Sequence, residues 1–209
     1  MEGLKELFAV DPYHERGTLL ITEIRLQADD PRTFEALLTA IEVTNSSLLR
    51  YQYARYLLGR QELENAKAQF DILVREPQPD ADHLISAALV DIELSQPVSA
   101  LVHLDRVLSG RQRINDAYFF RGLALVQVQD TAQALDAFAR VAPSTNYTRA
   151  LREAANLLIS DGDINATNGF FERQRVAHPQ GREISFTFHA DTLEALGSDQ
   201  ARNVLTTAL

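Results

Sequence analysis

The chain has 209 residues, of which 45% are hydrophobic and 23% charged, as is usual for a folded globular domain. A formal net charge of −9 argues against general nucleic-acid binding, because contacts to phosphates need clustered lysine and arginine. The absence of cysteine excludes disulfides, thiolate chemistry and cysteine-based zinc sites, and no window is apolar enough to predict a membrane span.

Helical periodicity predicts short helices along the whole chain. Apolar residues recur at intervals of three and four, which is the pattern of helices and not of strands. Glycine and proline separate the segments, as at Gly59, Pro97 and Pro143. The expected helices cover residues 4–10, 13–27, 31–43, 48–58, 63–74, 84–94, 100–108, 116–128, 130–142, 146–159, 164–177, 182–196 and 201–209.

The helices repeat in pairs at an interval of 34 residues. The interval is kept by Ala54, Ala88 and Gly122, by Ala66, Ala100 and Ala134, and by Phe70, Leu104 and Phe138. Such a period predicts stacked helix–turn–helix units, which work by presenting a surface and so favour a binding protein over an enzyme. The units fall near 13–46, 47–80, 81–114, 115–147, 148–181 and 182–209 of a single solenoid, and 1–12 reads as the tail of a preceding unit. We expect the chain to be part of a longer array.

The unit at 115–147 carries the residues that suggest a family. It has Tyr118, Gly122, Leu125, Ala134 and Phe138 at positions 4, 8, 11, 20 and 24, and this pattern resembles the tetratricopeptide repeat (TPR). The unit at 148–181 matches with Ala155, Leu158, Gly162, Phe171 and Pro179. The resemblance implies an all-α fold, a right-handed superhelical solenoid of about 12–13 helices in antiparallel pairs. Asp91 at an apolar position and Thr167 in place of a small residue depart from the pattern.

In this family the first helix of each unit lines a concave groove that binds partners. Carried over to this chain, the partner-binding positions are Tyr51, Arg55, Leu58, Ile85, Leu89, Ile92, Phe119, Leu123, Val126, Arg149, Arg152 and Asn156. An apolar strip flanked by arginine fits a peptide with hydrophobic side chains and an acidic or carboxylate end. Packing of the strip against the chain itself, and binding on the convex face instead, stand as alternatives. The carboxylate clamp of chaperone-tail receptors is absent, because Tyr51, Gln52 and Arg55 occupy its positions.

Other polar residues have structural explanations. The segment 161–172 mimics a calcium-binding loop, but Ala166 stands where such a loop needs glycine. Asp29 and Asp30 beside Pro31 are expected to cap a helix. The five histidines, His14, His83, His103, His178 and His189, lack metal-ligand spacing and are expected on the surface or in the groove. The polar convex residues Arg106, Asp136, Arg140, Glu172 and Arg175 are expected to form a solvated surface.

The sequence therefore predicts no enzyme, no metal and no cofactor, since it lacks nucleophile-elbow, phosphate-loop and zinc-protease motifs. We expect a scaffold or adaptor that binds a protein or peptide. Tracts at 116–122, 138–141 and 146–158 resemble proteobacterial envelope TPR lipoproteins, which include adaptors of a carboxy-terminal processing protease. This resemblance implies a bacterial periplasmic location. The absence of cysteine also fits a cytoplasmic protein, so the cytoplasm is the alternative location. Residues 1–10 do not have the pattern of a signal peptide. A docking or regulatory domain of a multidomain enzyme, and a homo-oligomerisation module, are the alternatives.

Overall fold

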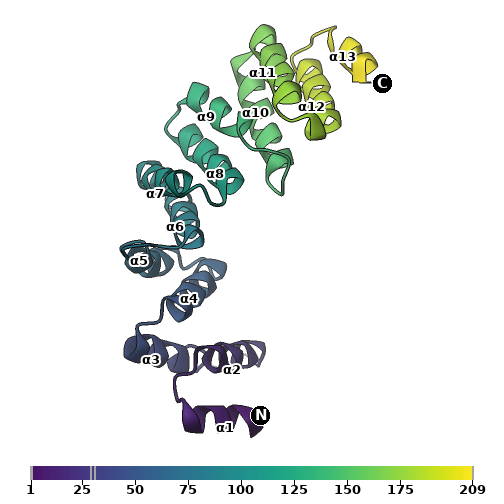
Figure 1. Cartoon of the computed structure of the whole chain (residues 1–209). Coiled ribbons are helices and arrows are strands. Elements are labelled where there is room, and N and C mark those ends of the chain that lie inside the picture. The colour runs from purple at the N-terminus through teal and green to yellow at the C-terminus, as the bar shows by residue number, and fades with distance from the viewer. Residues whose placement is uncertain (1, 29, 31, 209) are drawn as a thin grey trace. The chain divides into compact units, whose positions relative to one another are not determined.

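The computed structural model describes residues 2–28, 30 and 32–208, and every regular element in these ranges is helical (Figure 1). The α-helices are α1 Glu2–Val10, α2 Glu15–Gln27, α3 Glu35–Thr44, α4 Ser47–Gly59, α5 Leu63–Leu73, α6 Ala81–Glu93, α7 Pro97–Gly110, α8 Ile114–Gln127, α9 Thr131–Ala139, α10 Tyr147–Asp161, α11 Ile164–Ala177, α12 Arg182–Ala195 and α13 Ala201–Ala208. A 3-10 turn, Pro179–Gly181, precedes α12. The expected all-α fold of helix pairs is confirmed. The chain forms two compact units, Met1–Val90 and Asp91–Leu209, each made of several repeats. From here on, the first unit and the second unit mean these two parts of the chain.

In the first unit, α4 and α5 pack as an antiparallel hairpin around small residues. Ala54 of α4 and Ala66 of α5 are fully buried, and Phe70 is buried in the same hairpin. The ring of Tyr51 meets the ring of Phe70 edge-on at 6.1 Å. The small residues of the repeat therefore lie where the two helices approach, as the 34-residue period predicts.

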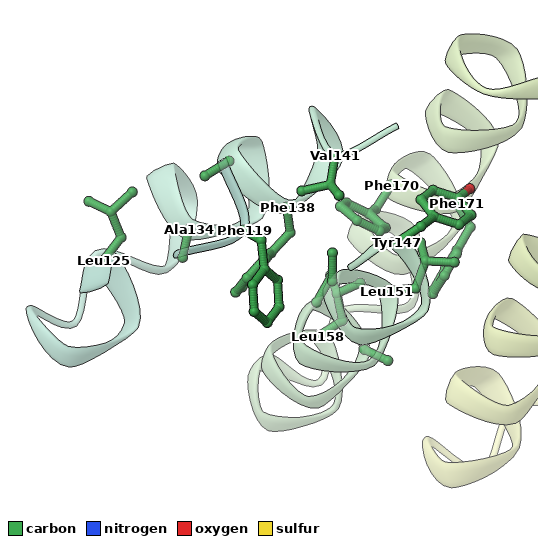
Figure 2. Packing of buried hydrophobic residues seen from close by; sticks show 14 residues of the cluster. Phe119, Leu125, Ala134, Phe138, Val141, Tyr147, Leu151, Leu158, Phe170 and Phe171 are labelled. Carbon is green, nitrogen blue, oxygen red and sulfur yellow. The ribbon is translucent and has the colours of Figure 1, made fainter. Parts of the chain in front are cut away.

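The second unit has a continuous apolar core through α8, α9, α10 and α11 (Figure 2). Gly122 of α8 packs directly against Phe138 of α9, because a Cβ built on Gly122 would lie only 2.3 Å from the Phe138 ring. Phe171 of α11 and Tyr147 of α10 are both buried in the same cluster. Gly181 is needed for the same reason as Gly122, since its Cβ would lie 2.4 Å from the Tyr147 ring.

Side-chain caps set the starts of several helices. The Oγ atom of Ser46 accepts a hydrogen bond from the backbone N–H of Leu49 at the start of α4. Asp163 caps α11 through its Oδ1 atom, which accepts from the backbone N–H groups of Asn165 at 2.7 Å and Ala166 at 3.0 Å. Gly162 ends α10 with a φ of +79°, a left-handed conformation that favours glycine. The segment that mimics a calcium loop is thus an ordinary turn between two helices.

One expected cap is wrong. Helix α3 begins at Glu35, and its N-cap residue Phe34 makes no side-chain cap hydrogen bond. The Oδ1 atom of Asp30 instead accepts from the backbone N–H of Arg32 at 2.8 Å, and its carboxylate pairs with the Arg32 guanidinium at 3.1 Å. The helix starts too late for Asp30 to reach it, so this carboxylate stabilises the preceding turn; Asp29 and Pro31 lie outside the described residues.

The two departures from the repeat pattern are both buried and both have polar partners. Asp91 is 1% exposed, and its Oδ2 atom lies 3.5 Å from Nε2 of His103. Thr167 donates its hydroxyl hydrogen bond to the backbone oxygen of Asp163 at 2.9 Å, one turn earlier in α11. A buried polar side chain is tolerated when such a partner is supplied.

Candidate partner-binding faces

Helices α8 and α10 place half of the predicted partner-binding residues within the second unit, and the two helices contact each other. Helix α10 also packs against α12 on its other side. These are the first helices of successive hairpins, so their outward positions share one surface. We call this surface the α8–α10 face, made of Phe119, Leu123, Val126, Arg149, Arg152 and Asn156.

The members of the α8–α10 face differ in accessibility. Phe119 is only 1% exposed, and the guanidinium carbon of Arg149 lies 4.6 Å from the centre of its ring. Val126 is 36% exposed and Leu123 is half-buried. Arg152 and Asn156 are exposed. A partner on this face would therefore meet the Arg149 guanidinium where the repeat pattern places Phe119.

Arg149 is positioned by an amide and not by a carboxylate. Its Nη1 atom donates to Oδ1 of Asn146 at 3.2 Å, and Nδ2 of Asn146 donates to Oδ1 of Asp116 at 2.7 Å. Asp116 is already paired with Arg113 at 2.7 Å. In the part of the chain that the structure describes, neither Arg149 nor Arg152 lies within ion-pair distance of a carboxylate. Arg149 and Arg152 are thus two exposed cations that form no ion pair among the described residues.

The first unit presents a second predicted surface, the α4–α6 face, made of Tyr51, Arg55, Leu58, Ile85 and Leu89. The Tyr51 ring lies 4.9 Å from the His83 ring, and its hydroxyl lies 3.4 Å from Oγ of Ser86. The Arg55 guanidinium carbon lies 5.8 Å from the same Tyr51 ring. The tyrosine is thus held by α6 on one side and flanked by an exposed cation.

Three predicted residues are not exposed as a groove-lining role requires. Ile85 and Ile92 are each only 7% exposed, and Phe119 is 1% exposed. The Ile92 backbone oxygen accepts a hydrogen bond from Nε2 of Gln127 at 3.0 Å, which ties α6 to α8 within the second unit. These three side chains stabilise the fold. The binding role of the other nine stays a prediction.

Solved structures with the same arrangement of helices are TPR proteins. YrrB, described as a TPR protein with an unusual peptide-binding site, superposes with a TM-score of 0.63 at 15% identity over 98% of this chain and 96% of that chain. The chain has the tetratricopeptide repeat fold. A TPR protein from Parabacteroides merdae superposes with a TM-score of 0.59 at 14% identity over 99% and 90% of the two chains. PilW, a type IV pilus biogenesis factor, gives 0.55 at 17% identity over 97% and 87%.

No protein-family model and no curated protein matches the sequence. At the identities of the solved structures the likeness establishes the TPR fold alone. Within the described residues, no helix is both long and apolar enough to cross a membrane. No three histidine or acidic side chains come together there as a metal site would need.

One polar site lies outside the positions that the TPR pattern selects. His189 of α12 is 2% exposed, which contradicts its expected place on the surface or in the groove. Its ring stacks on Phe171 at 5.0 Å. Arg175 of α11 is half-buried, although we expected it on the solvated convex surface. The sequence did contain a signal for His189, because it follows the small residue Ala155 by 34 positions and so occupies the small-residue position of the unit at 182–209.

Proposed function

We propose that this chain is a non-catalytic TPR scaffold that binds a protein segment with apolar side chains and a carboxylate group on its α8–α10 face. The observation that carries the proposal is the pair Arg149 and Arg152. Both are exposed and without a carboxylate partner among the described residues, in a chain whose net charge is −9. Arginine presents a planar fork of donors that matches a carboxylate.

The apolar part of the proposed ligand follows from the neighbouring helix. Val126 exposes a third of its surface, and Leu123 is partly accessible on the same helix, α8. Extended or helical peptides commonly bind by anchoring apolar side chains beside a charged contact. The peptide-binding site named for YrrB, which shares this fold, supports the same kind of ligand.

The proposal extends to an adaptor role in the bacterial envelope, with the periplasm as its place of action. The tract 116–122 and its resemblance to envelope TPR lipoproteins support this extension. The fold shared with PilW, a pilus biogenesis factor, is compatible with it. A protease or an assembly machine would then be the protein to which the bound segment is delivered.

A peptide-display selection tests the binding proposal. The full chain is used to select from random 12-residue peptides, beside an Arg149→Glu/Arg152→Glu double variant and an Arg173→Glu control on the exposed side of α11. We expect wild type and control to enrich peptides that combine apolar residues with aspartate, glutamate or a free C-terminus. We expect the double variant to lose them by about tenfold or more in affinity, because each charge-assisted hydrogen bond contributes about 1.5–3 kcal/mol.

Equal binding by the double variant would show that the α8–α10 face is not the site. Enrichment of peptides without acidic groups would contradict the proposed ligand. If no peptide is enriched, the proposal that this chain binds a peptide by itself is wrong. Light scattering would then show whether the chain is a homo-oligomerisation module.

A further inference from the structure

A pocket of about 310 Å³ opens where α11, α12 and α13 meet in the second unit. Its lining is unusually polar for a junction between TPR helices, where the repeat pattern places small and apolar residues. The lining residues are Asn168, Glu172, Arg175, Phe186, His189, Gln200, Asn203 and Val204. Neither the α8–α10 face nor the α4–α6 face includes any of them.

A chain of hydrogen bonds fixes the protonation of the pocket. Nη1 of Arg175 donates to Nδ1 of His189 at 3.2 Å, so Nδ1 carries no proton. The proton is on Nε2, which donates to Oδ1 of Asn168 at 2.8 Å, and Nδ2 of Asn168 donates to Oε1 of Gln200 at 2.9 Å. Burial, reinforced by the Arg175 charge, lowers the pKa of His189 to about 4. His189 is therefore neutral at pH 7, and the charges at the pocket are those of Arg175 and Glu172.

Among the described residues, Arg175 forms no ion pair, although the Glu172 carboxylate lines the same pocket. Its guanidinium carbon lies 4.4 Å from the Phe186 ring, and that of Arg182 lies 5.4 Å from the same ring. Of the carboxylates that the structure describes, none lies within ion-pair distance of either arginine. Burial lowers the pKa of Arg175, with a smaller contribution from the Arg182 charge, whereas the Glu172 charge acts in the opposite direction. A half-buried cation that forms no ion pair is costly even with Glu172 in the same pocket, and an anion that enters the pocket removes part of that cost.

We propose that the pocket between α11, α12 and α13 binds one carboxylate-bearing residue of a partner protein, either an aspartate or glutamate side chain or a C-terminal residue. Arg175 supplies the charge, and the His189 ring holds its guanidinium in place. The volume of about 310 Å³ is at the small end of ligand pockets, which suits a single residue. Glu172 at the rim disfavours a dianion such as phosphate more than a singly charged carboxylate. The site does not depend on the α8–α10 face.

The test is a titration of the ¹⁵N-labelled full chain followed by NMR. The probes are N-acetyl-glutamate N-methylamide, its glutamine counterpart and inorganic phosphate. We expect the glutamate probe to shift the Arg175 Nε–H and His189 Nε2–H signals in a saturable way, and the glutamine probe to leave them in place. Arg175→Gln should weaken binding of the glutamate probe about tenfold or more, because the charge-assisted contact is removed. Arg173→Gln, an exposed neighbour on the same helix, should bind like wild type.

A second variant keeps the test decisive if Arg175→Gln does not fold. Glu172→Gln removes the rim carboxylate and should tighten binding of the glutamate probe by about threefold or more. Equal responses to the glutamate and glutamine probes, or no effect of Glu172→Gln, would overturn the proposal. Tighter binding of inorganic phosphate than of the glutamate probe would also overturn it, since the pocket would then select phosphate. None of these readouts changes if the α8–α10 face binds no peptide.

Discussion

The Arg149 guanidinium lies 4.6 Å from the centre of the Phe119 ring and covers a side chain that is otherwise enclosed by the core. The two residues come from different repeats, so the contact joins α8 to α10. We expect Arg149→Ala to lower the free energy of unfolding by about 1 kcal/mol through loss of this cation–π contact. Urea denaturation measures the change. Arg152→Ala is the matched control and should be close to neutral, so equal losses in both variants would contradict a role for the Phe119 contact.

Gly122 tests how far the small-residue pattern is a packing requirement. Gly122→Ala would place a Cβ 2.3 Å from the Phe138 ring, and relief requires the ring or the α8–α9 hairpin to move. We expect a loss of about 1–3 kcal/mol, which is typical of overpacking in a core. Gly110→Ala, at the end of α7 with no atom in its way, should change stability little. Recovery of stability in a Gly122→Ala/Phe138→Leu double variant would show that the clash is the cause; a neutral Gly122→Ala would show that it is not.

How much of the fold and of the candidate site could be predicted from the sequence depends on which contacts recur in every repeat. Ala54, Ala66 and Phe138 each belong to a series of residues that recurs every 34 positions, and each is buried. The period therefore predicted both the helices and the core. The burial of Phe119 was not predictable in the same way. Its cover, Arg149, comes from the next unit and is not part of the repeat.

The polar pocket was missed for a related reason. Arg175 and His189 lie 14 residues apart on different helices, and only tertiary packing brings them together. A pattern that assigns α11 residues to a solvated face cannot say that α12 and α13 close over one of them. The replacement of a small residue by His189 at its repeat position was the visible sign, because a ring there must find partners inside the array.

Substitution of Asp163 distinguishes between two roles for this residue, a helix cap and a calcium ligand. Asp163→Ala should lower the free energy of unfolding by about 1 kcal/mol, because the N–H groups of Asn165 and Ala166 lose their acceptor. Asp161→Ala, in the same turn, should be neutral or slightly stabilising, since Asp161 ends α10 where a negative charge is unfavourable. Thermal unfolding with and without millimolar calcium provides the check. A calcium-dependent rise in Tm that either substitution abolishes would contradict the capping role.

His189 makes the stability of the second unit depend on pH in a defined window. Its pKa falls from 6.5 to about 4 on folding, so the unfolded chain takes up a proton at this residue before the folded chain does. The stabilisation is present above pH 6.5 and is lost as the pH falls toward 4, by about 3 kcal/mol at most. Protonation would set a second cation against Arg175.

Urea denaturation of wild type and His189→Gln at several pH values between 7.5 and 4.5 isolates this contribution, because other acid-sensitive groups are common to both proteins. We expect the stability advantage of wild type to shrink steadily below pH 6.5. If the substitution prevents folding, an NMR titration of the native His189 ring gives the same information, since the signal should stay that of a neutral ring down to about pH 5. A parallel pH dependence in the two proteins, or a native titration near pH 6.5, would show that burial beside Arg175 does not hold the ring neutral.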